Sequence, residues 1–434
     1  MENLRDKSDL VKEKDIILNR KERNRNIKDK STGDFQEIEI ELTFDGENKI
    51  EFLHLEKIIQ NQNREIDRDN IQMYINGIKY PFRNYHSFYD YKNTVRILIN
   101  KNIKIISFSN MFYDCERITK ITFKNIQKPS DNSLSYMFQN CEDLVEIVGL
   151  ENINTSNITY MDSMFSRCKR LKTINLPLQT ENVTYMSRMF SGCKSLIEIS
   201  GLERLNTSNL VYASYMFEDC CSLMTIKGLS NINLSKVREI NGLFKGCSHL
   251  ISVKGVENWD TSNVESIESL FEGCIFLKNL RPIRNWNMKS VTDISNAFRQ
   301  MTKISEIDLN WNVSKVKNMQ YCFENCHCLE KIKGLETFEV SNAKNLSGLF
   351  KCCYKLEALP GIKFWNTKKA KDMSEMFYGC RALKELNLSN LFRTNNVYNM
   401  SKMFYDCHKL QKIESHFNFP TSFPAKICTK IVWS

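Results

Sequence analysis

One landmark recurs along most of the chain: a phenylalanine that a cysteine follows three residues later, usually with Met or Leu before the phenylalanine. Successive landmarks are 25 to 27 residues apart, and most gaps are 27. The landmark residues are Phe112, Phe138, Phe165, Phe190, Phe217, Phe244, Phe271, Phe298, Phe323, Phe350, Phe377 and Phe404. A period this constant predicts a solenoid, in which each unit contacts mainly its neighbours.

A single unit, residues 206–229, predicts one helix and one strand. Apolar residues recur at steps of three and four, which is the spacing of one helix face: Leu210, Ala213, Met216, Phe217 and Cys220. Ser208 and Asn209 stand where a helix N-cap is expected. Leu223 and Ile226 mark a short strand, and Gly228 ends it. Because neither element buries its apolar face alone, the units must stack.

Stacking turns each repeated position into a column of equivalent side chains. The cysteine column is Cys115, Cys141, Cys168, Cys193, Cys220, Cys247, Cys274, Cys326, Cys353, Cys380 and Cys407. Parallel side chains in one column do not face each other as a disulfide requires, so we expect buried, unpaired thiols. Met301 replaces the cysteine in one unit, and the units at 165–190 and 298–323 are shortened to 25 residues.

These motifs resemble a known family. Asn206-Thr-Ser-Asn-Leu, followed by Tyr-Met-Phe-Glu-Asp-Cys, is similar to the BspA-like leucine-rich repeats, in the subgroup with a Met-Phe-x-x-Cys signature. The resemblance covers about 101–415 and implies an interaction or adhesion protein. The expected fold is therefore an α/β repeat solenoid, leucine-rich-repeat-like, with about twelve units of one helix plus one strand and a C-terminal cap at 416–434.

The segment ahead of the repeats has a different period. Residues 1–35 are rich in charged and Asn side chains and predict a disordered or loosely helical lead. Within 36–100, apolar and polar residues alternate at 38–44, 71–76 and 94–99, which predicts strands. Asp45-Gly46 predicts a hairpin turn, and Leu55, Ile58 and Ile59 suggest a helix.

This order of elements resembles a ubiquitin-like β-grasp domain, a small α+β fold. The resemblance implies a partner-binding patch at Tyr74, Arg96 and Leu98. The alternative is that the segment only caps the open end of the solenoid, as terminal units of solenoids do.

No catalytic motif supports an enzyme. Nucleophile-elbow, zinc-protease and phosphate-loop motifs are absent, and the six histidines are scattered. The densest set of potential zinc ligands is Cys322, Cys326, His327, Cys328, Cys352 and Cys353, whose spacing fits no standard zinc pattern. We therefore expect no enzyme activity, no cofactor and no metal.

A protein partner is the expected ligand. Residues flanking the buried position of each strand should point outward. Among them Lys227, Lys254 and Arg281 form a basic stripe in three consecutive units, and Lys331 and Lys333 follow after acidic Glu306 and Asp308. We expect this face to bind an acidic protein surface; an ordinary solvated face is the alternative. The stripe lacks the interleaved aromatic residues that single-stranded nucleic acid binding needs.

The function expected from the sequence is a non-enzymatic protein–protein interaction scaffold. The N-terminus has no apolar signal segment, and no window is apolar enough to span a membrane, so the expected location is cytoplasmic. The first alternative is a secreted or surface-exposed adhesin, as the family resemblance implies. The second is a ubiquitin-pathway adaptor that uses the β-grasp domain. The sequence does not indicate the oligomeric state.

Overall fold

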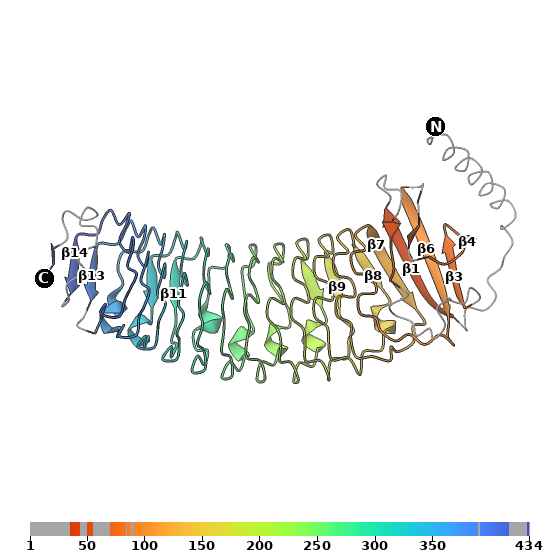
Figure 1. Ribbon diagram of the computed structural model, residues 1–434, viewed down its shortest axis with the longest axis horizontal. Coiled ribbons are helices and arrows are strands. Elements are labelled where there is room, and N and C mark those ends of the chain that lie inside the picture. Colours follow the sequence, from red (N-terminus) through yellow and green to blue (C-terminus); the bar gives the residue numbers. More distant parts are fainter. Residues whose placement is uncertain are drawn as a thin grey trace, which may run out of the picture.

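A computed structural model describes residues 35–43, 50–54, 70–83, 85–86, 88, 91–388, 391–415 and 432–433 of the chain. The repeats stack one behind another into a long arc that runs from β7 to β14 (Figure 1). The predicted solenoid is therefore confirmed. The predicted lead at 1–35 and the C-terminal segment 416–434 lie almost entirely outside the described residues.

The N-terminal strands extend the sheet of the solenoid. One six-stranded sheet has the order β4-β3-β6-β1-β7-β8. Its members are β4 (Ile78–Tyr80), β3 (Ile71–Ile75), β6 (Lys92–Asn100), β1 (Phe35–Thr43), β7 (Ile118–Lys124) and β8 (Glu146–Val148). β7 and β8 belong to the first repeats and pair in parallel, whereas β1 pairs antiparallel with both β6 and β7. The N-terminal segment thus continues directly into the repeat sheet.

This pairing corrects the β-grasp expectation. A β-grasp domain places its first and last strands side by side and parallel, but β1 and β6 are antiparallel, with Phe35 opposite Asn100. The expected hairpin partner of β1, β2 (Ile50–Glu51), instead pairs with β5 (Tyr85–His86) in a separate sheet. The expected turn at Asp45-Gly46 and the helix at 55–59 lie outside the described residues. The adaptor hypothesis, which needed a ubiquitin-like domain, has lost its basis.

The predicted helix of each unit is also wrong. No α-helix occurs in the described residues, and within 210–220 Tyr212 is a bridge residue and residues 214–219 form tight turns. The residues two before and two after every landmark phenylalanine have positive φ, for example Tyr215 (62°) and Asp219 (54°) around Phe217. An α-helix needs φ near −63° throughout, so two left-handed residues four positions apart exclude it. The turns nevertheless bury the same apolar set that a helix would bury.

Hydrogen bonds explain why these turns are stable. Around Phe244, the N–H groups of Leu243, Lys245 and Cys247 donate to carbonyls three residues earlier in the same unit. The intervening N–H groups of Gly242, Phe244 and Gly246 donate to carbonyls of the next unit, at 2.7 to 3.1 Å. Successive N–H groups therefore donate in turn within the unit and to the next unit, so these buried backbone donors are paired.

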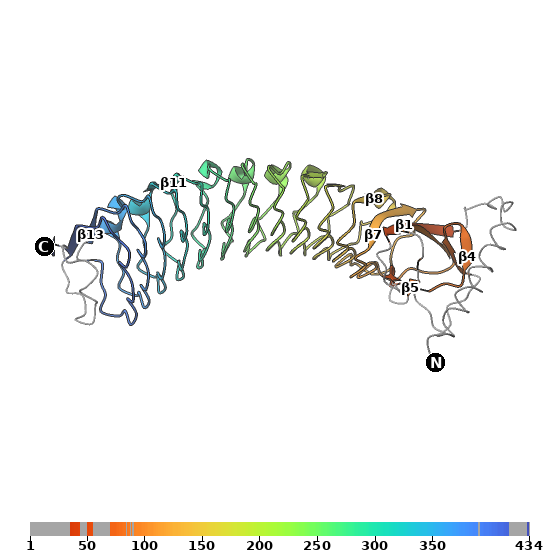
Figure 2. The same ribbon diagram turned by 90° about the horizontal axis from the view of Figure 1, so that it is seen from above.

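The two sides of the arc differ in how continuously neighbouring units pair. On one side, an unbroken series of parallel bridges, here named the bridge ladder, joins Ser133, Tyr160, Tyr185, Tyr212, Glu239, Ser266, Asp293, Asn318, Asn345, Asp372 and Asn399. On the strand side, pairing is interrupted between β10 (Glu198–Ser200) and β11 (Glu306–Asp308). Bridged backbones lie about 4.8 Å apart. Unpaired ones can separate further, which explains an arc that is convex on the strand side (Figure 2).

The two units of 25 residues are shorter because no 3-10 helix follows their strands. Most strand positions lead into a 3-10 helix of three to five residues; these helices are η2 (Leu150–Asn152), η3 (Leu202–Arg204), η4 (Leu229–Asn231), η5 (Val256–Asn258), η6 (Arg281–Ile283), η7 (Leu335–Thr337) and η8 (Pro360–Phe364). None follows β9 (Thr173–Asn175) or β11, the strands of the two short units. There the strand pairs in parallel with the next one, β10 or β12 (Lys331–Lys333). At the C-terminal end β13 (Glu385–Leu388), β14 (Lys412–Ser415) and β15 (Val432–Trp433) form one more parallel sheet.

The core consists of the predicted columns. All twelve landmark phenylalanines are buried, and neighbouring rings stack with centroids 5.4 to 6.1 Å apart. The Asn-Thr-Ser-Asn motif does not cap a helix. The Asn206 side chain accepts from the Ser208 N–H at 3.1 Å, and the Asn209 side chain donates to the Glu181 carbonyl one unit earlier at 2.7 Å. The motif therefore forms a turn and ties that turn to its neighbour.

Candidate interaction surfaces

The predicted outward residues of the strand face do point to solvent. Lys227, Lys254, Arg281, Lys331 and Lys333 are all exposed, while the strand residue between each flanking pair is buried. Figure 2 places this face on the outer edge of the arc, where β8, β11 and the 3-10 helices lie. The five cations thus lie along one convex surface.

Acidic neighbours pair with some of these cations. Lys227 lies 3.4 Å from Glu198 of the preceding unit, and Lys333 forms an ion pair with Glu306. Both pairs are exposed, so each contributes at most about 1 kcal/mol to stability. Asp308 pairs with Arg284 at 3.0 Å. Lys254, Arg281 and Lys331 take part in none of the ion pairs found in the described ranges, so their charges face water.

An exposed apolar row lies beside the first three cations, and sequence reasoning missed it. Ile197, Met224 and Ile251 occupy the same position in three consecutive units and are 55%, 55% and 46% exposed. Phe276 is 42% exposed in the following unit and stacks on His249 with centroids 5.6 Å apart. We name these four apolar residues the apolar row. Ile197, Met224 and Ile251 each lie seven residues after a landmark phenylalanine. The sequence shows this column, but only the structure shows that its side chains are exposed.

The expected N-terminal patch does not form one exposed surface. Leu98 is buried, at 7% exposure. Arg96 makes two hydrogen bonds to Glu37, at 3.0 and 3.1 Å, and the Tyr74 hydroxyl donates to Gln72 at 2.8 Å. The Arg96 contact joins β6 to β1, and the Tyr74 contact lies within β3, so Arg96 and Leu98 stabilise the six-stranded sheet.

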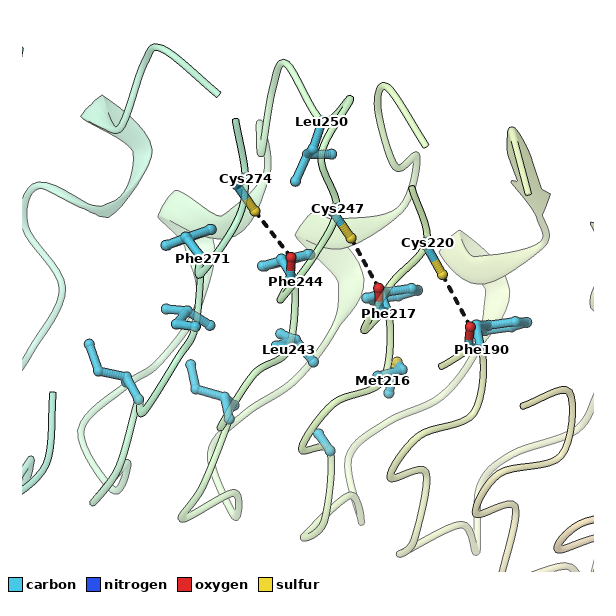
Figure 3. Close-up of a cluster of buried hydrophobic side chains, with 14 of the residues drawn as sticks. Phe190, Met216, Phe217, Cys220, Leu243, Phe244, Cys247, Leu250, Phe271 and Cys274 are labelled. Atoms are coloured by element: carbon cyan, nitrogen blue, oxygen red, sulfur yellow. Dashed lines mark hydrogen bonds between the residues drawn. The ribbon is translucent and has the colours of Figure 1, made fainter. Parts of the chain in front are cut away.

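The cysteines form a hydrogen-bonded ladder instead of disulfides. The column cysteines are buried and form no disulfides, as predicted. Ten of them donate their thiol hydrogen to the landmark carbonyl of the preceding unit, at 3.0 to 3.2 Å; Cys220, Cys247 and Cys274 show this in Figure 3. Burial raises the pKa of Cys193 and Cys326 to about 12 and that of the other interior column thiols in the same direction. Such thiols are poor nucleophiles at neutral pH.

The densest cysteine cluster serves packing. Cys326 and Cys353 belong to the thiol ladder, and His327 stacks on Tyr354 with centroids 4.7 Å apart. Across the described ranges, no three His, Cys, Asp or Glu side chains gather closely enough to hold a metal ion.

A second charged column runs next to the landmark phenylalanines. The residue after each landmark alternates in sign through six consecutive units: Glu218, Lys245, Glu272, Arg299, Glu324 and Lys351. Neighbours pair across units, for example Lys245 with Glu272 at 3.3 Å and Arg299 with Glu324 at 2.6 Å. Alternation lets a stack of charges about 5 Å apart attract instead of repel.

Comparisons with known proteins find similar solved structures but assign no role to this chain. Two solved structures resemble the chain. One is a leucine-rich cell surface protein from Faecalibacterium prausnitzii A2-165, with 19% sequence identity and a TM-score of 0.36, covering 68% of this chain and 75% of that one. The other is a leucine-rich repeat protein from Eubacterium ventriosum, with 15% identity and a TM-score of 0.30, covering 68% and 79%. No curated protein matches the chain.

Within the described ranges, no helix has the length and apolar character that crossing a bilayer requires.

A family model matches most of the repeat region. The family described as Mycoplasma protein of unknown function, DUF285, matches residues 106–226, 132–252, 214–334 and 326–424. These overlapping matches cover well over half of the sequence, and the chain therefore belongs to the DUF285 family.

Proposed function

We propose that this protein is a non-enzymatic interaction scaffold that binds a protein partner on the strand-lined face of its solenoid. The supporting observation is the apolar row beside Lys227, Lys254 and Arg281 in consecutive units. Exposed apolar stretches rimmed by polar residues are typical of protein-binding surfaces. The cations select a partner with acidic residues, and the apolar row supplies area that is removed from water.

The two components have different roles in binding. Burying the side chains of Met224 and Ile251 would give most of the affinity, at about 25 cal/mol for each Å² of apolar area removed from water. Lys254 and Arg281 form no ion pair with an acid in the described part of the chain, so they steer an acidic partner and set the rate of association. The exposed Glu198–Lys227 pair is weak enough for a partner carboxylate to replace it.

The test is affinity purification from the source cell with tagged full-length protein, followed by mass spectrometry. Two variants separate the components: Met224→Asp with Ile251→Asp, and Lys227→Glu with Lys254→Glu and Arg281→Glu. All of these side chains are exposed, so the fold should persist, which circular dichroism checks. We expect both variants to lose the same partner. Retention of that partner by both would refute binding at this face.

A matched control changes the same number of charges elsewhere. Lys289→Glu with Lys315→Glu and Lys368→Glu carries the same charge change in exposed turns outside the strands. The control should retain the partner if the strand face binds it. Loss of the partner from both charge variants would show that net charge, and not this surface, controls the capture.

A further inference from the structure

Three lysines in consecutive units form a column beside the bridge ladder. Lys317, Lys344 and Lys371 each precede a bridge residue, and all three side chains are exposed. The Lys344 N–H donates to the Lys317 carbonyl and the Lys371 N–H to the Lys344 carbonyl, both at 2.8 Å. Their backbones are thus fixed directly above one another. We name these three residues the lysine column.

The column is a stack of like charges that the fold leaves uncompensated. Nearby units are about 4.5 Å apart beside the bridge ladder, as the stacked rings of Tyr185 and Tyr212 indicate. Like charges at such a spacing repel. None of the ion pairs in the part of the chain that the structure describes involves these three lysines.

Two other series of charges in this chain show how such repulsion can be relieved. The column after the landmark phenylalanines alternates in sign, with Glu324 between Arg299 and Lys351. Earlier in the same column as the lysines, Arg238 is followed one unit later by Glu265, and the two form an ion pair. An acid in the next unit relieves the repulsion in these two columns, whereas the lysine column, like Lys254 and Arg281 on the strand face, has no ion pair among the described residues.

Asp372, an acid in the adjacent column, is already engaged. Asp372 accepts hydrogen bonds from the Ser374 backbone N–H at 2.8 Å, from the Ser374 hydroxyl at 2.6 Å and from the Asn399 side chain at 3.3 Å. These bonds occupy its carboxylate, and no ion pair joins it to a described lysine. The lysine column thus forms no ion pair with any acid among the residues that the structure describes.

We propose that the lysine column binds an acidic α-helix of a protein partner, with one carboxylate on each turn aligned along the solenoid axis. Repulsion spreads the three ammonium groups beyond the spacing of their backbones, toward the 5.4 Å rise of a helical turn. Side chains on one face of an extended peptide recur at about 6.8 Å, a poorer match. Tyr398 follows Lys371 in the same column and is exposed, but one ring does not make the interleaved aromatic platforms that single-stranded nucleic acid binding uses. This second site is independent of the strand face.

The probe is a fluorescein-labelled synthetic peptide of about 20 residues, rich in alanine, with Glu at each helical turn on one face. Its binding to the full-length protein is measured by fluorescence anisotropy at 50 and 200 mM NaCl. The test variant combines Lys317→Ala, Lys344→Ala and Lys371→Ala. The matched control removes the same charge from the strand face with Lys227→Ala, Lys254→Ala and Arg281→Ala.

We expect wild type and the strand-face variant to bind the peptide equally, and the lysine-column variant to bind about tenfold or more weakly, since three ion pairs are lost. Binding should weaken at the higher salt concentration. Equal binding by both variants would overturn the site. A proline-containing peptide of the same charge that binds as tightly would overturn the helical partner, and a 20-base-pair DNA duplex that binds more tightly would assign the column to nucleic acid. Neither outcome touches the strand-face proposal, because the strand-face variant tests it separately.

Discussion

The thiol of Cys247 donates a hydrogen bond to the carbonyl of Phe217, one unit earlier, at 3.0 Å. The same carbonyl accepts the N–H of Cys220 within its own unit at 3.2 Å. One backbone oxygen therefore closes a turn and also joins two units. Met301 has no hydrogen to donate, so the ladder of thiol bonds is interrupted at Phe271.

Replacing Cys247 by Ala should lower the free energy of unfolding by about 1–2 kcal/mol, because a buried sulfur and one hydrogen bond are lost. The measurement is urea unfolding followed by circular dichroism. Cys221, next to the column and partly exposed, provides the matched control; Cys221→Ala should change the free energy by less than about 0.5 kcal/mol. Equal effects would show that the ladder position has no special role.

Because burial raises the pKa of the column thiols, we expect the free energy of unfolding to fall at alkaline pH. Burial raises the pKa of Cys193 and Cys326 from 9.0 to about 12. The folded state therefore holds these protons where the unfolded chain releases them. Their contribution is complete below pH 9 and is lost as the pH rises from 9 to 12.

The slope of stability against pH measures this contribution. Each thiol changes the free energy of unfolding by about 1.4 kcal/mol per pH unit within that range. Urea unfolding at pH 8.5, 9.5 and 10.5 should give a steeper decline for wild type than for the double variant Cys193→Ala and Cys326→Ala. Lysines and tyrosines titrate in both proteins, so the difference between the slopes isolates the thiols. Parallel slopes would contradict the proposed effect.

The sequence predicts the columns of this fold better than its backbone. Phe217 and Cys220 are buried, as the period requires, because burial depends on which residues repeat. The helix prediction fails because tight turns bury apolar residues at the same three- and four-residue steps. Tyr215 at positive φ has no local signature, since left-handed backbone is rare for a bulky residue. Hydrogen bonds to the next unit hold it there, and these are not visible in one unit's sequence.

Strand pairing and side-chain exposure also depend on residues that are far apart in the sequence. The alternating segments do form β1, β3 and β6, yet the antiparallel pairing of β1 with β7 joins residues about 80 positions apart. Likewise the stripe at Lys227 and Lys254 was predicted from strand alternation, whereas the exposure of Met224 required the backbone. Composition alone does not distinguish a buried apolar column from an exposed one.

Two glycines with positive φ should differ in how much stability is lost when alanine replaces them. Gly334 has φ of 92°, and a Cβ built there would lie 1.6 Å from the Leu309 carbonyl oxygen of the preceding unit. Gly273 has φ of 73°, but its Cβ would meet no atom nearer than 3.5 Å. Both alanine variants pay about 1–2 kcal/mol for left-handed backbone, and only Gly334→Ala must also move the backbone.

Thermal unfolding followed by circular dichroism compares the two alanine variants. Gly334→Ala should have the lower midpoint by several degrees, because its extra clash is with backbone that cannot rotate away. A midpoint equal to that of Gly273→Ala would mean that the 3-10 helix η7 shifts without cost.

The alternating ion column predicts a difference between two glutamates of equal charge. Glu324 has a side chain only 7% exposed and contacts Arg299 at 2.6 Å and Lys351 at 3.6 Å. Glu330 is 59% exposed and pairs with Lys355 at 3.7 Å. Glu324→Gln keeps the shape but leaves two cations facing each other in a poorly hydrated site. It should lower the free energy of unfolding by about 1–3 kcal/mol. Glu330→Gln should change it by less than about 0.5 kcal/mol, because water already screens that pair. Urea unfolding at 50 and 500 mM NaCl checks both values. The cost at Glu324 should persist at high salt, and a cost that vanishes there would show that the column is solvated like the surface.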